Sequence, residues 1–453
     1  MKKISTLAML LALSIGLRAG GLMTNTNYHI AFDRMMARGA TFDIDAAYSN
    51  PAGLAWGHEG WQLSFNAQKP FQWRDIEATV PAALAPAMGF TSHKFKGKAV
   101  ANPFVPALFA SYKQDKWALS MMAGIVGSGG KVTYDDGVPM FVVPVRGMLA
   151  TNGLMPNQYS LDAYIQGKQY IYGIQANFTY RFNDHWAAAA GLRGNIYSGF
   201  NRGHIVATLN AAPIDLANLQ IDVDQKGFGM APLLSLDYRW KGLTLAGRYE
   251  FRTQLNIPNE TNRLDAQIIN PATIGTGTPG YLPQAAVMAQ FGDKVAPYQD
   301  GVKTRYDMPA LLVLAAGYEL RPNLRITTEF HFFDDKNAKM AADRQKEISR
   351  GTLEYLAGVE WDINKTFTVS CGAQRTDYAI EDDYQTNASF ACDSYSVGLG
   401  GAINVNQHLR FNLGYFCSLY SDYERNASYS GITVGETYSR TNHVFGLGVD
   451  YKF

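Results

Sequence analysis

This sequence has few long apolar runs, few cysteines and a net charge close to zero. No stretch of about 18 apolar residues follows the N-terminal segment, which argues against a membrane-spanning helix. The three cysteines, Cys371, Cys392 and Cys417, are odd in number and lack paired spacing, so a disulfide framework is not indicated. A net charge of +1 leaves no electrostatic footprint for nucleic acid.

Aromatic residues and glycine, by contrast, are abundant. Aromatic residues make up 13% of the chain and there are 43 glycines, whereas charged residues make up only 17%. This balance suits a membrane β-barrel, which has aromatic girdles on its outer face and small residues in its lumen.

Residues 1–19 have the features of a signal peptide. Lys2 and Lys3 form a basic start, residues 7–17 form an apolar core too short to span a bilayer, and Leu17-Arg18-Ala19 resembles a cleavage site. No cysteine follows, which argues against a lipoprotein. We therefore expect secretion to the periplasm; a buried N-terminal helix is the alternative.

Alternation of apolar and polar residues with a period of two is the main structural signal. It is clear in 61–68, where Trp61, Leu63 and Phe65 alternate with polar residues, and it recurs in 324–332 and 445–453. This is the period of a β-strand, in which successive side chains point to opposite faces. In a soluble sandwich the apolar face would meet a core, whereas in a membrane barrel it meets lipid.

The connections between strands decide between these two folds. We expect about fourteen strands, near 61–68, 104–112, 117–126, 168–182, 185–199, 225–240, 243–256, 308–320, 323–334, 349–361, 365–378, 393–405, 408–419 and 441–453. Every second connection is very short, whereas 127–167, 200–224 and 257–307 are long. This segregation is typical of outer-membrane barrels, whose short turns are periplasmic. The sequence therefore predicts an all-β fold, a transmembrane antiparallel barrel over 61–453 in a Gram-negative outer membrane.

Aromatic residues also mark the strand ends. Trp117, Trp186, Trp240 and Trp361 each flank a short turn, which predicts an aromatic belt at the periplasmic interface. The final strand ends on Phe453 and resembles the signal by which the barrel-assembly machinery recognises barrels. The expected surroundings are outer-membrane lipid and lipopolysaccharide, and a sealed single barrel needs no partner, so we expect a monomer.

Residues 20–60 follow neither the strand period nor the helical period. Within them, 37–54 is rich in small residues and turn formers, with Asp43, Asp45 and the run Asn50-Pro51-Ala52-Gly53. A barrel of about fourteen strands leaves a lumen that its own side chains do not fill. We therefore interpret residues 20–60 as a hatch, a plug folded inside the lumen.

The hatch also resembles a known plug. Gly39-Ala40, Asp45-Ala46-Ala47 and Asn50-Pro51-Ala52-Gly53-Leu54 are similar to the N-terminal plug of the FadL family, outer-membrane transporters of long-chain fatty acids and other hydrophobic compounds. Ile44 interrupts the two adjacent acids that this family often has, so Asp45 alone matches them. The resemblance implies passive uptake of a hydrophobic small molecule, without a cofactor or energy coupling.

Apolar residues outline a possible ligand path. Those in the two long loops are Ile214, Leu216, Leu219, Leu282, Val287, Met288 and Phe291, and apolar side chains in solvated loops can mark a ligand groove. Packing of the two loops on each other explains them equally well, but the resemblance favours a groove. Inside the barrel, the hatch offers flexible apolar side chains for a pocket, Ile30, Phe32, Met35 and Met36.

An acidic cargo would need a cation to bind its carboxylate. The candidates are Arg193, Arg202, Arg248, Arg252, Arg325 and Lys339, although pairing with Glu250, Glu329 and similar acids explains most of them. The resemblance favours Arg202 and Lys339.

For release, the resemblance implies a lateral opening at a kink in the third strand, 117–126. The glycines at its end, Gly124, Gly127, Gly129 and Gly130, indicate a bulge or bend. A plain strand end explains the same glycines more simply.

Catalytic and metal-binding motifs find no support. Gly127 to Gly130 is not a G-x-S-x-G elbow, Gly398 to Gly401 is not a dinucleotide loop, and the eight histidines have no metal-ligand spacing. We therefore do not expect an enzyme. The alternative to a transporter is an adhesion or structural barrel whose loops bind partners, followed by an open polar porin. A polar porin needs neither apolar loops nor a hatch, and an adhesion barrel needs no apolar pocket in its lumen.

Overall fold

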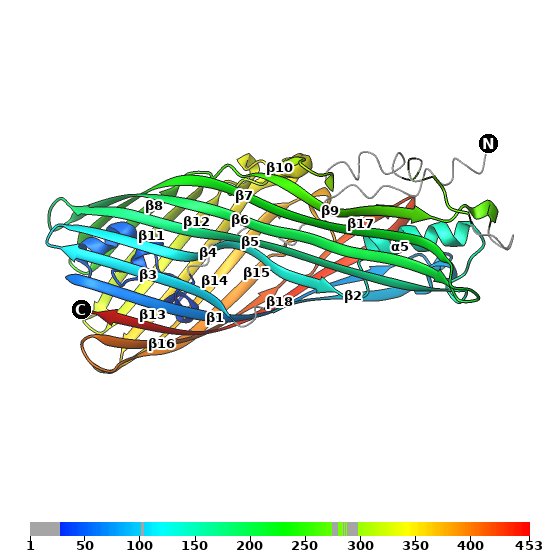
Figure 1. Ribbon diagram of the computed structural model, residues 1–453. Coiled ribbons are helices and arrows are strands. Elements are labelled where there is room, and N and C mark those ends of the chain that lie inside the picture. Colours follow the sequence, from blue (N-terminus) through cyan, green and yellow to red (C-terminus); the bar gives the residue numbers. More distant parts are fainter. Residues whose placement is uncertain (1–27, 101–103, 274–279, 284, 286, 288–297) are drawn as a thin grey trace.

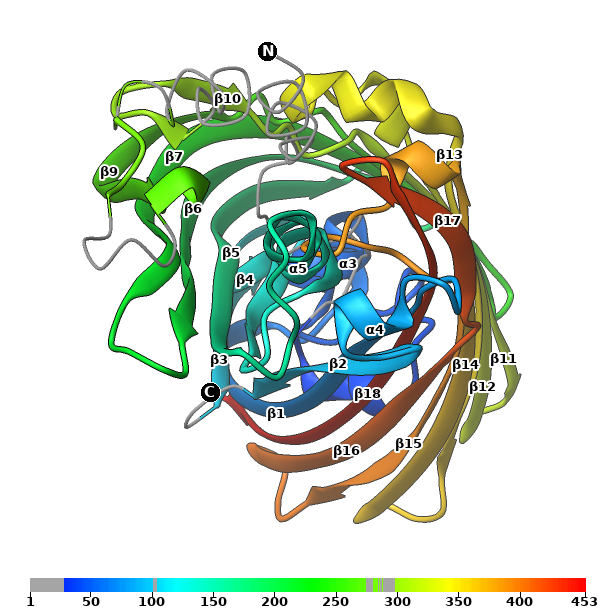
Figure 2. The same cartoon turned by 90° about the vertical axis from the view of Figure 1, so that its right-hand side faces the viewer.

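The strands of this protein form one antiparallel sheet that closes on itself. The computed structural model describes residues 28–100, 104–273, 280–283, 285, 287 and 298–453. The ring closes where β1 (Gly60–Thr79) pairs with β18 (Ile432–Lys452), from Gln62 opposite Lys452 to Thr79 opposite Gly435. The result is a long barrel with a single lumen (Figure 1; Figure 2).

The described residues form eighteen strands. They make up fourteen positions around the barrel, here called staves, because four staves consist of two strands each. The interrupted staves are β2 (Ser92–Val100) with β3 (Val105–Gln114), β8 (Leu243–Glu250) with β9 (Asn256–Ile268), β10 (Lys303–Arg305) with β11 (Leu311–Arg321), and β16 (Leu409–Tyr420) with β17 (Tyr423–Tyr429). The continuous ones, besides β1 and β18, are β4 (Trp117–Tyr134), β5 (Tyr159–Arg181), β6 (Trp186–Leu209), β7 (Asp215–Trp240), β12 (Leu324–Phe333), β13 (Ile348–Asp362), β14 (Phe367–Ile380) and β15 (Ser394–Asn404). The predicted barrel of about fourteen strands is confirmed.

The alternation read from the sequence places apolar side chains outside and polar ones inside. On β1, Trp61 is 54% exposed and Phe65 is 46% exposed, whereas Ser64 and Asn66, on either side of Phe65, are buried. On β18, Leu447 is 65% exposed. An outward face of large apolar side chains over all staves is the face that a barrel presents to lipid. The three cysteines are free, as the sequence indicates.

The two ends of the barrel differ. At one, the turn end, consecutive staves are joined by short turns, such as that between β7 and β8, where Lys241 (φ 46°) and Gly242 (φ 84°) adopt left-handed backbone conformations. Trp186, Trp240 and Trp361 are exposed at this end, which places the predicted aromatic belt there. The C-terminus lies at the same end (Figure 1).

At the other end, the loop end, the strands are longer than the sequence predicts. The expected loop 200–224 is a hairpin, because 200–209 continues β6 and 215–224 continues β7. Likewise 127–134 and 159–167 extend β4 and β5, and 257–268 belongs to β9. Alternation of apolar and polar residues is required only where lipid covers the outer face. The parts of a strand that extend beyond the bilayer therefore show a weaker alternation in the sequence.

The mouth at the loop end is filled by helices. α5 (Pro139–Thr151) and the short α4 (Ala85–Met88) lie inside it, with α5 seen nearly end-on (Figure 2). They pack with strand residues such as Ile76, Phe95 and Tyr438 into one apolar core, here called the mouth cluster. Short 3-10 turns complete this end, η3 (Pro271–Thr273), η5 (Asp335–Asn337), η6 (Ala341–Glu347) and η7 (Asp382–Tyr384).

The described part of the hatch, residues 28–59, lies inside the ring (Figure 2). It contains α2 (Ile30–Arg34), α3 (Ala46–Ser49) and the 3-10 helix η2 (Pro51–Trp56). α2 contacts β14, β15, β16, β18 and β1, whereas η2 contacts β4 to β7, so the segment reaches across the lumen. In the described part of the chain, no helix combines the length and apolarity needed to cross a bilayer. The expected signal peptide and residues 20–27 of the hatch lie outside the described residues.

Candidate functional site

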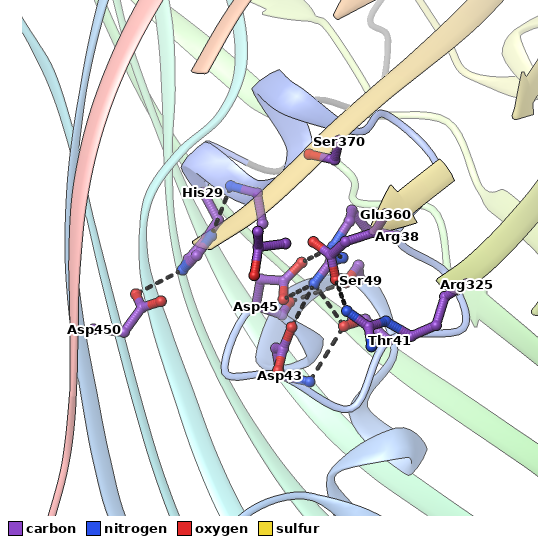
Figure 3. Close-up of polar contacts among 12 residues, drawn as sticks. His29, Arg38, Thr41, Asp43, Asp45, Ser49, Arg325, Glu360, Ser370 and Asp450 are labelled. Atoms are coloured by element: carbon purple, nitrogen blue, oxygen red, sulfur yellow. Dashed lines mark hydrogen bonds and ion pairs between the residues drawn. The ribbon is translucent and has the colours of Figure 1, made fainter. Parts of the chain in front are cut away.

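The hatch begins with a histidine that caps α2 and fastens it to the barrel. Nδ1 of His29 accepts a hydrogen bond from the Ala31 amide at 3.1 Å. Its Nε2 lies 3.1 Å from Oδ1 of Asp450 on β18 and 3.1 Å from Oγ of Ser64 on β1 (Figure 3). A single buried ring therefore joins the start of the hatch to the two strands that close the barrel.

The loop after α2 is held by a bidentate ion pair. Nε of Arg38 lies 2.8 Å from Oδ2 of Asp45, and Nη2 lies 2.8 Å from Oδ1 of the same carboxylate (Figure 3). The same guanidinium also donates to Thr41 at 2.7 Å and to the half-exposed Asp43 at 3.1 Å. Two parallel charge-assisted bonds fix both position and orientation. Asp45, which the sequence singles out, is thus the residue that closes the 38–45 loop.

A second ionic cluster ties the hatch to β12 and β13. Glu360 accepts from Arg34 of α2 and from Arg325 of β12, the latter at 2.8 Å, and its carboxylate is 4.0 Å from Arg38. Arg34 also donates to Oγ of Ser370 at 2.7 Å. Glu360 is therefore the one acid in this cluster that contacts two hatch arginines and one barrel arginine.

The Asn50-Pro51-Ala52-Gly53 run binds the opposite wall. Asn50 donates to Asp237 of β7 at 2.8 Å and to the Thr41 carbonyl at 3.2 Å. The Pro51 carbonyl accepts from Thr179 of β5 at 2.8 Å, and proline suits the first turn of η2 because its missing N–H has no partner there. The side-chain amide of Asn50 thus joins two hatch segments to the barrel. This contact explains why the motif contains an asparagine.

Gly53 is required by this arrangement. A Cβ added at Gly53 would overlap the Thr41 carbonyl oxygen and the Asn50 amide. We expect Gly53→Ala to destabilise the hatch by about 1–3 kcal/mol, the usual cost of overpacking. Faster hydrogen exchange in 41–53 would show this. Gly247→Ala is the control, because the nearest atoms to its added Cβ are at 3.8 Å and unchanged exchange is expected.

Glycines on the inner wall make room for α2. Added Cβ atoms at Gly398 and Gly414 would meet Asp33, and one at Gly446 would meet both Asp33 and Ile30. Gly398 and Gly400, in the run from Gly398 to Gly401, therefore belong to the wall against which α2 packs. Close approach of two backbones is the usual reason for glycine inside a strand.

Asp33, which packs against these wall glycines, is a buried acid with no cationic partner among the described residues. Gln68 donates to its Oδ1 at 2.7 Å, whereas Oδ2 has no hydrogen-bond partner among the described residues. Burial raises the pKa of the Asp33 carboxyl well above its usual range, so the folded hatch retains a proton that the released segment loses near pH 4.

The stability of the hatch should therefore fall as pH rises above about 4, up to the folded-state pKa. We expect Asp33→Asn to protect the hatch at alkaline pH, with little effect at acidic pH. The measurement is tryptic cleavage at Arg34 from pH 6 to 9, as the ratio of variant to unaltered protein. Asp43→Asn, at a half-exposed acid, should show no such trend; a flat ratio for Asp33→Asn would contradict the prediction.

Two cavities lie on either side of the hatch. The inner cavity, of about 160 Å³, lies between the hatch and the mouth cluster, and Ala99 borders both. The turn-end cavity, of about 850 Å³, is bordered by hatch residues 37–43 and by turn residues such as Gly242 and Asn364. Met36 lines the inner cavity and Met35 the turn-end cavity, so the hatch at these two residues separates the cavities.

The four hatch residues expected to form a pocket have different surroundings. Phe32 and Met36 line the inner cavity, together with Phe416 and Val444. Met35 lines the turn-end cavity. Ile30 lines neither cavity and instead packs on the wall glycines Gly414, Gly446 and Gly448.

The apolar residues expected in a loop groove pack into the mouth cluster. Leu216 and Val287 are 0% and 1% exposed, and Ile214, Leu219 and Leu282 pack against the same cluster. Met288 and Phe291 lie outside the described residues. The structure thus shows the mutual packing that the sequence left as an alternative to an open groove.

The expected carboxylate contacts lie away from both cavities. Arg202 is 3.0 Å from Asp222 and 3.2 Å from Asp224, and the exposed Lys339 follows η5. Arg193 and Arg248 both pair with Glu250, as the sequence suggested for ordinary lumen charges. Two cationic residues that sequence reasoning missed, Arg74 and Arg440, line the inner cavity. Nothing in the sequence distinguishes them from other arginines on strands.

The third stave is distorted beside the inner cavity. The register of β4 against β5 shifts between Ile125 and Gly127 and again between Ser128 and Gly130, which has a φ of 75°. Beyond these bulges β4 continues to Tyr134. The bulge indicated by the glycines is present, and the simpler interpretation, a strand end near 126, is wrong.

Comparison with known proteins agrees with this architecture. A family model described as an outer membrane protein β-barrel domain matches residues 281–453, and no curated protein matches the chain. A solved FadL homologue from Pseudomonas aeruginosa superposes with a TM-score of 0.65 at 14% identity, covering 96% of this chain and 100% of that chain. The chain has the fold of the FadL-type outer-membrane β-barrels.

Other FadL-type barrels of known structure are similar. The toluene transporter TodX from Pseudomonas putida has a TM-score of 0.59 at 13% identity, covering 96% of this chain and 100% of that chain. The toluene transporter TbuX from Ralstonia pickettii has a TM-score of 0.53 at 11% identity, covering 90% and 94%. At such identities the likeness concerns the fold. In outer-membrane barrels the short turns are periplasmic, so the turn end faces the periplasm and the loop end the exterior.

Proposed function

We propose that this FadL-type barrel takes up hydrophobic small molecules passively across the outer membrane. The observation that carries the proposal is a folded hatch that reaches across the lumen and borders an internal cavity, with Phe32, Met36 and Phe416 in the cavity wall. An open porin needs no hatch, and an adhesion barrel needs no internal cavity. The similar structures that are described as toluene transporters support this choice.

The proposed path has three parts. Cargo reaches the inner cavity from outside after displacement of part of the mouth cluster, which is an apolar surface once opened. It then rests against Phe32 and Met36 of the hatch. Release is lateral, through the wall at the β4 bulges, because Ile125, Gly127 and Gly130 line the same cavity. The remaining expectations belong to this proposal: long-chain fatty acids among the cargo, a monomeric barrel, contact with lipopolysaccharide, and folding by the barrel-assembly machinery.

Binding to purified protein in detergent tests the function. We expect radiolabelled toluene and oleate to bind saturably and a small sugar not to compete. Phe32→Ala should weaken toluene binding about tenfold, since it removes apolar contact in the cavity. Phe42→Ala is the matched control, because Phe42 belongs to the hatch but contacts Trp56 and lies outside the inner cavity. Absence of saturable binding by any apolar probe would overturn the proposal and favour the adhesion barrel.

A further inference from the structure

The inner cavity has an unusual charge pattern for an apolar binding site. Three basic side chains, Arg74, Lys131 and Arg440, are in its wall, and none of the described residues that line it is an aspartate or a glutamate. Other lumen arginines are paired with acids, as Arg193 and Arg248 are with Glu250. Positive charge in this cavity is therefore not balanced by its own wall.

Arg74 and Arg440 are also direct neighbours. They are opposite each other in the antiparallel pairing of β1 with β18, and both side chains face the cavity. Like charges directly opposite on neighbouring strands are destabilising. Neither arginine has a carboxylate within ion-pair distance among the described residues.

The polar contacts of the two guanidinium groups are few. Arg74 is 3% exposed, and its Nε donates to Oε1 of Gln72 at 3.3 Å. Nε of Arg440 is buried without a hydrogen-bond partner, and its guanidinium lies over the ring of Tyr420 at 4.5 Å. A buried donor without an acceptor is costly, and an anion between the two groups would satisfy it and screen their repulsion.

Each of the nearby acids accepts a hydrogen bond from a group other than Arg74 and Arg440. Glu354, which accepts from Gln374 of the cavity wall, also pairs with His331 at 2.9 Å. Asp33 is bound by Gln68 on the hatch side of the cavity. Neither is placed to neutralise Arg74 or Arg440.

Size and lining restrict what such an anion can be. A dry cavity of about 150 Å³ is known to hold a single benzene ring, and the inner cavity has a volume of about 160 Å³. Its hatch side is apolar, with Phe32, Met36 and Phe416, whereas Arg74 and Arg440 lie on the side toward the mouth. A molecule matching both sides has one apolar ring and one carboxylate.

We propose that Arg74 and Arg440 form a carboxylate-binding site, and that the inner cavity selects small aromatic acids of the size of benzoate over neutral hydrocarbons. The ring packs against the hatch and the carboxylate lies between the two guanidinium groups. This rests on the proposed function, since it names the cargo class of the same cavity.

Calorimetric titration of the full-length protein in detergent tests the site. The probes are benzoate, the neutral isostere benzamide, and toluene. Because hydrogen bonds to charged groups are the strong ones, we expect benzoate to bind about tenfold to a hundredfold more tightly than benzamide. Arg440→Gln and, separately, Arg74→Gln should reduce benzoate affinity to that of benzamide and leave benzamide affinity unchanged.

The control is Arg202→Gln, which alters a lumen arginine that already pairs with Asp222 and Asp224 and does not line the cavity. It should preserve the preference for benzoate. Anthracene-9-carboxylate, with the same charge on three fused rings, should bind at least tenfold more weakly than benzoate; equal binding would overturn the size limit.

Failure of this inference is distinguishable from failure of the proposed function. Equal affinity for benzoate and benzamide in the unaltered protein, with saturable toluene binding, would overturn the carboxylate site and leave hydrophobic uptake intact. Absence of binding by all three probes would count against both. The comparison of benzoate with benzamide uses the unaltered protein. It therefore decides the inference even if an arginine variant misfolds.

Discussion

Glu360→Ala should release the hatch from the barrel wall without unfolding the barrel. Among the described residues, Glu360 is the only acid that contacts Arg34, Arg38 and Arg325 together. Its removal leaves Arg34, whose side chain is 1% exposed, without a described carboxylate partner. Breaking a buried ion pair from one side costs about 3–5 kcal/mol. The strand ladders are untouched, so the cost falls on hatch docking.

Two measurements follow the hatch in this variant. Trypsin should cleave at Arg34 and Arg38 while the barrel stays resistant, and ion conductance should appear across planar bilayers where the unaltered protein is closed. Glu319→Ala is the matched control, because Glu319 also pairs with an arginine, at 3.3 Å, but is 43% exposed at the turn end, where such pairs contribute little. Equal protection of the hatch in both variants would contradict the assignment.

Asp45→Ala should open the 38–45 loop of the hatch. It removes both acceptors of the bidentate pair and leaves the buried Arg38 guanidinium with Thr41, Asp43 and the more distant Glu360 at 4.0 Å. We expect a loss of about 3–5 kcal/mol in hatch stability. That loss corresponds to hydrogen exchange in residues 38–49 at least a hundredfold faster than in the unaltered protein.

Asp43→Ala provides a stringent comparison for this effect. Asp43 contacts the same guanidinium at 3.1 Å, yet its side chain is 44% exposed whereas that of Asp45 is 0% exposed. An exposed ion pair contributes about 0–1 kcal/mol. If Asp43→Ala accelerates exchange as much as Asp45→Ala, burial is not what makes the Arg38–Asp45 pair important.

Some strands of the barrel could be predicted from the sequence, whereas the outer parts of others could not. The strands within the bilayer were predicted in number and place because lipid on one face enforces strict alternation. The continuation of β6 to Leu209 and the start of β7 at Asp215 were missed, since no lipid imposes alternation there. The bulges of β4 were indicated by its glycines, which are local signals.

The amino-acid sequence by itself determined the barrel, its fourteen staves, the turn and loop ends, and the presence of a hatch segment carrying Asp45 and Asn50. These depend on periodicity and on local turn chemistry. Only the tertiary structure decided which charges are neutralised and which are not: Arg193, Arg202 and Arg325 meet acids, whereas Arg74 and Arg440 meet each other across β1 and β18. The reason is physical, because closure of the barrel brings together residues 366 positions apart whose register no local pattern encodes.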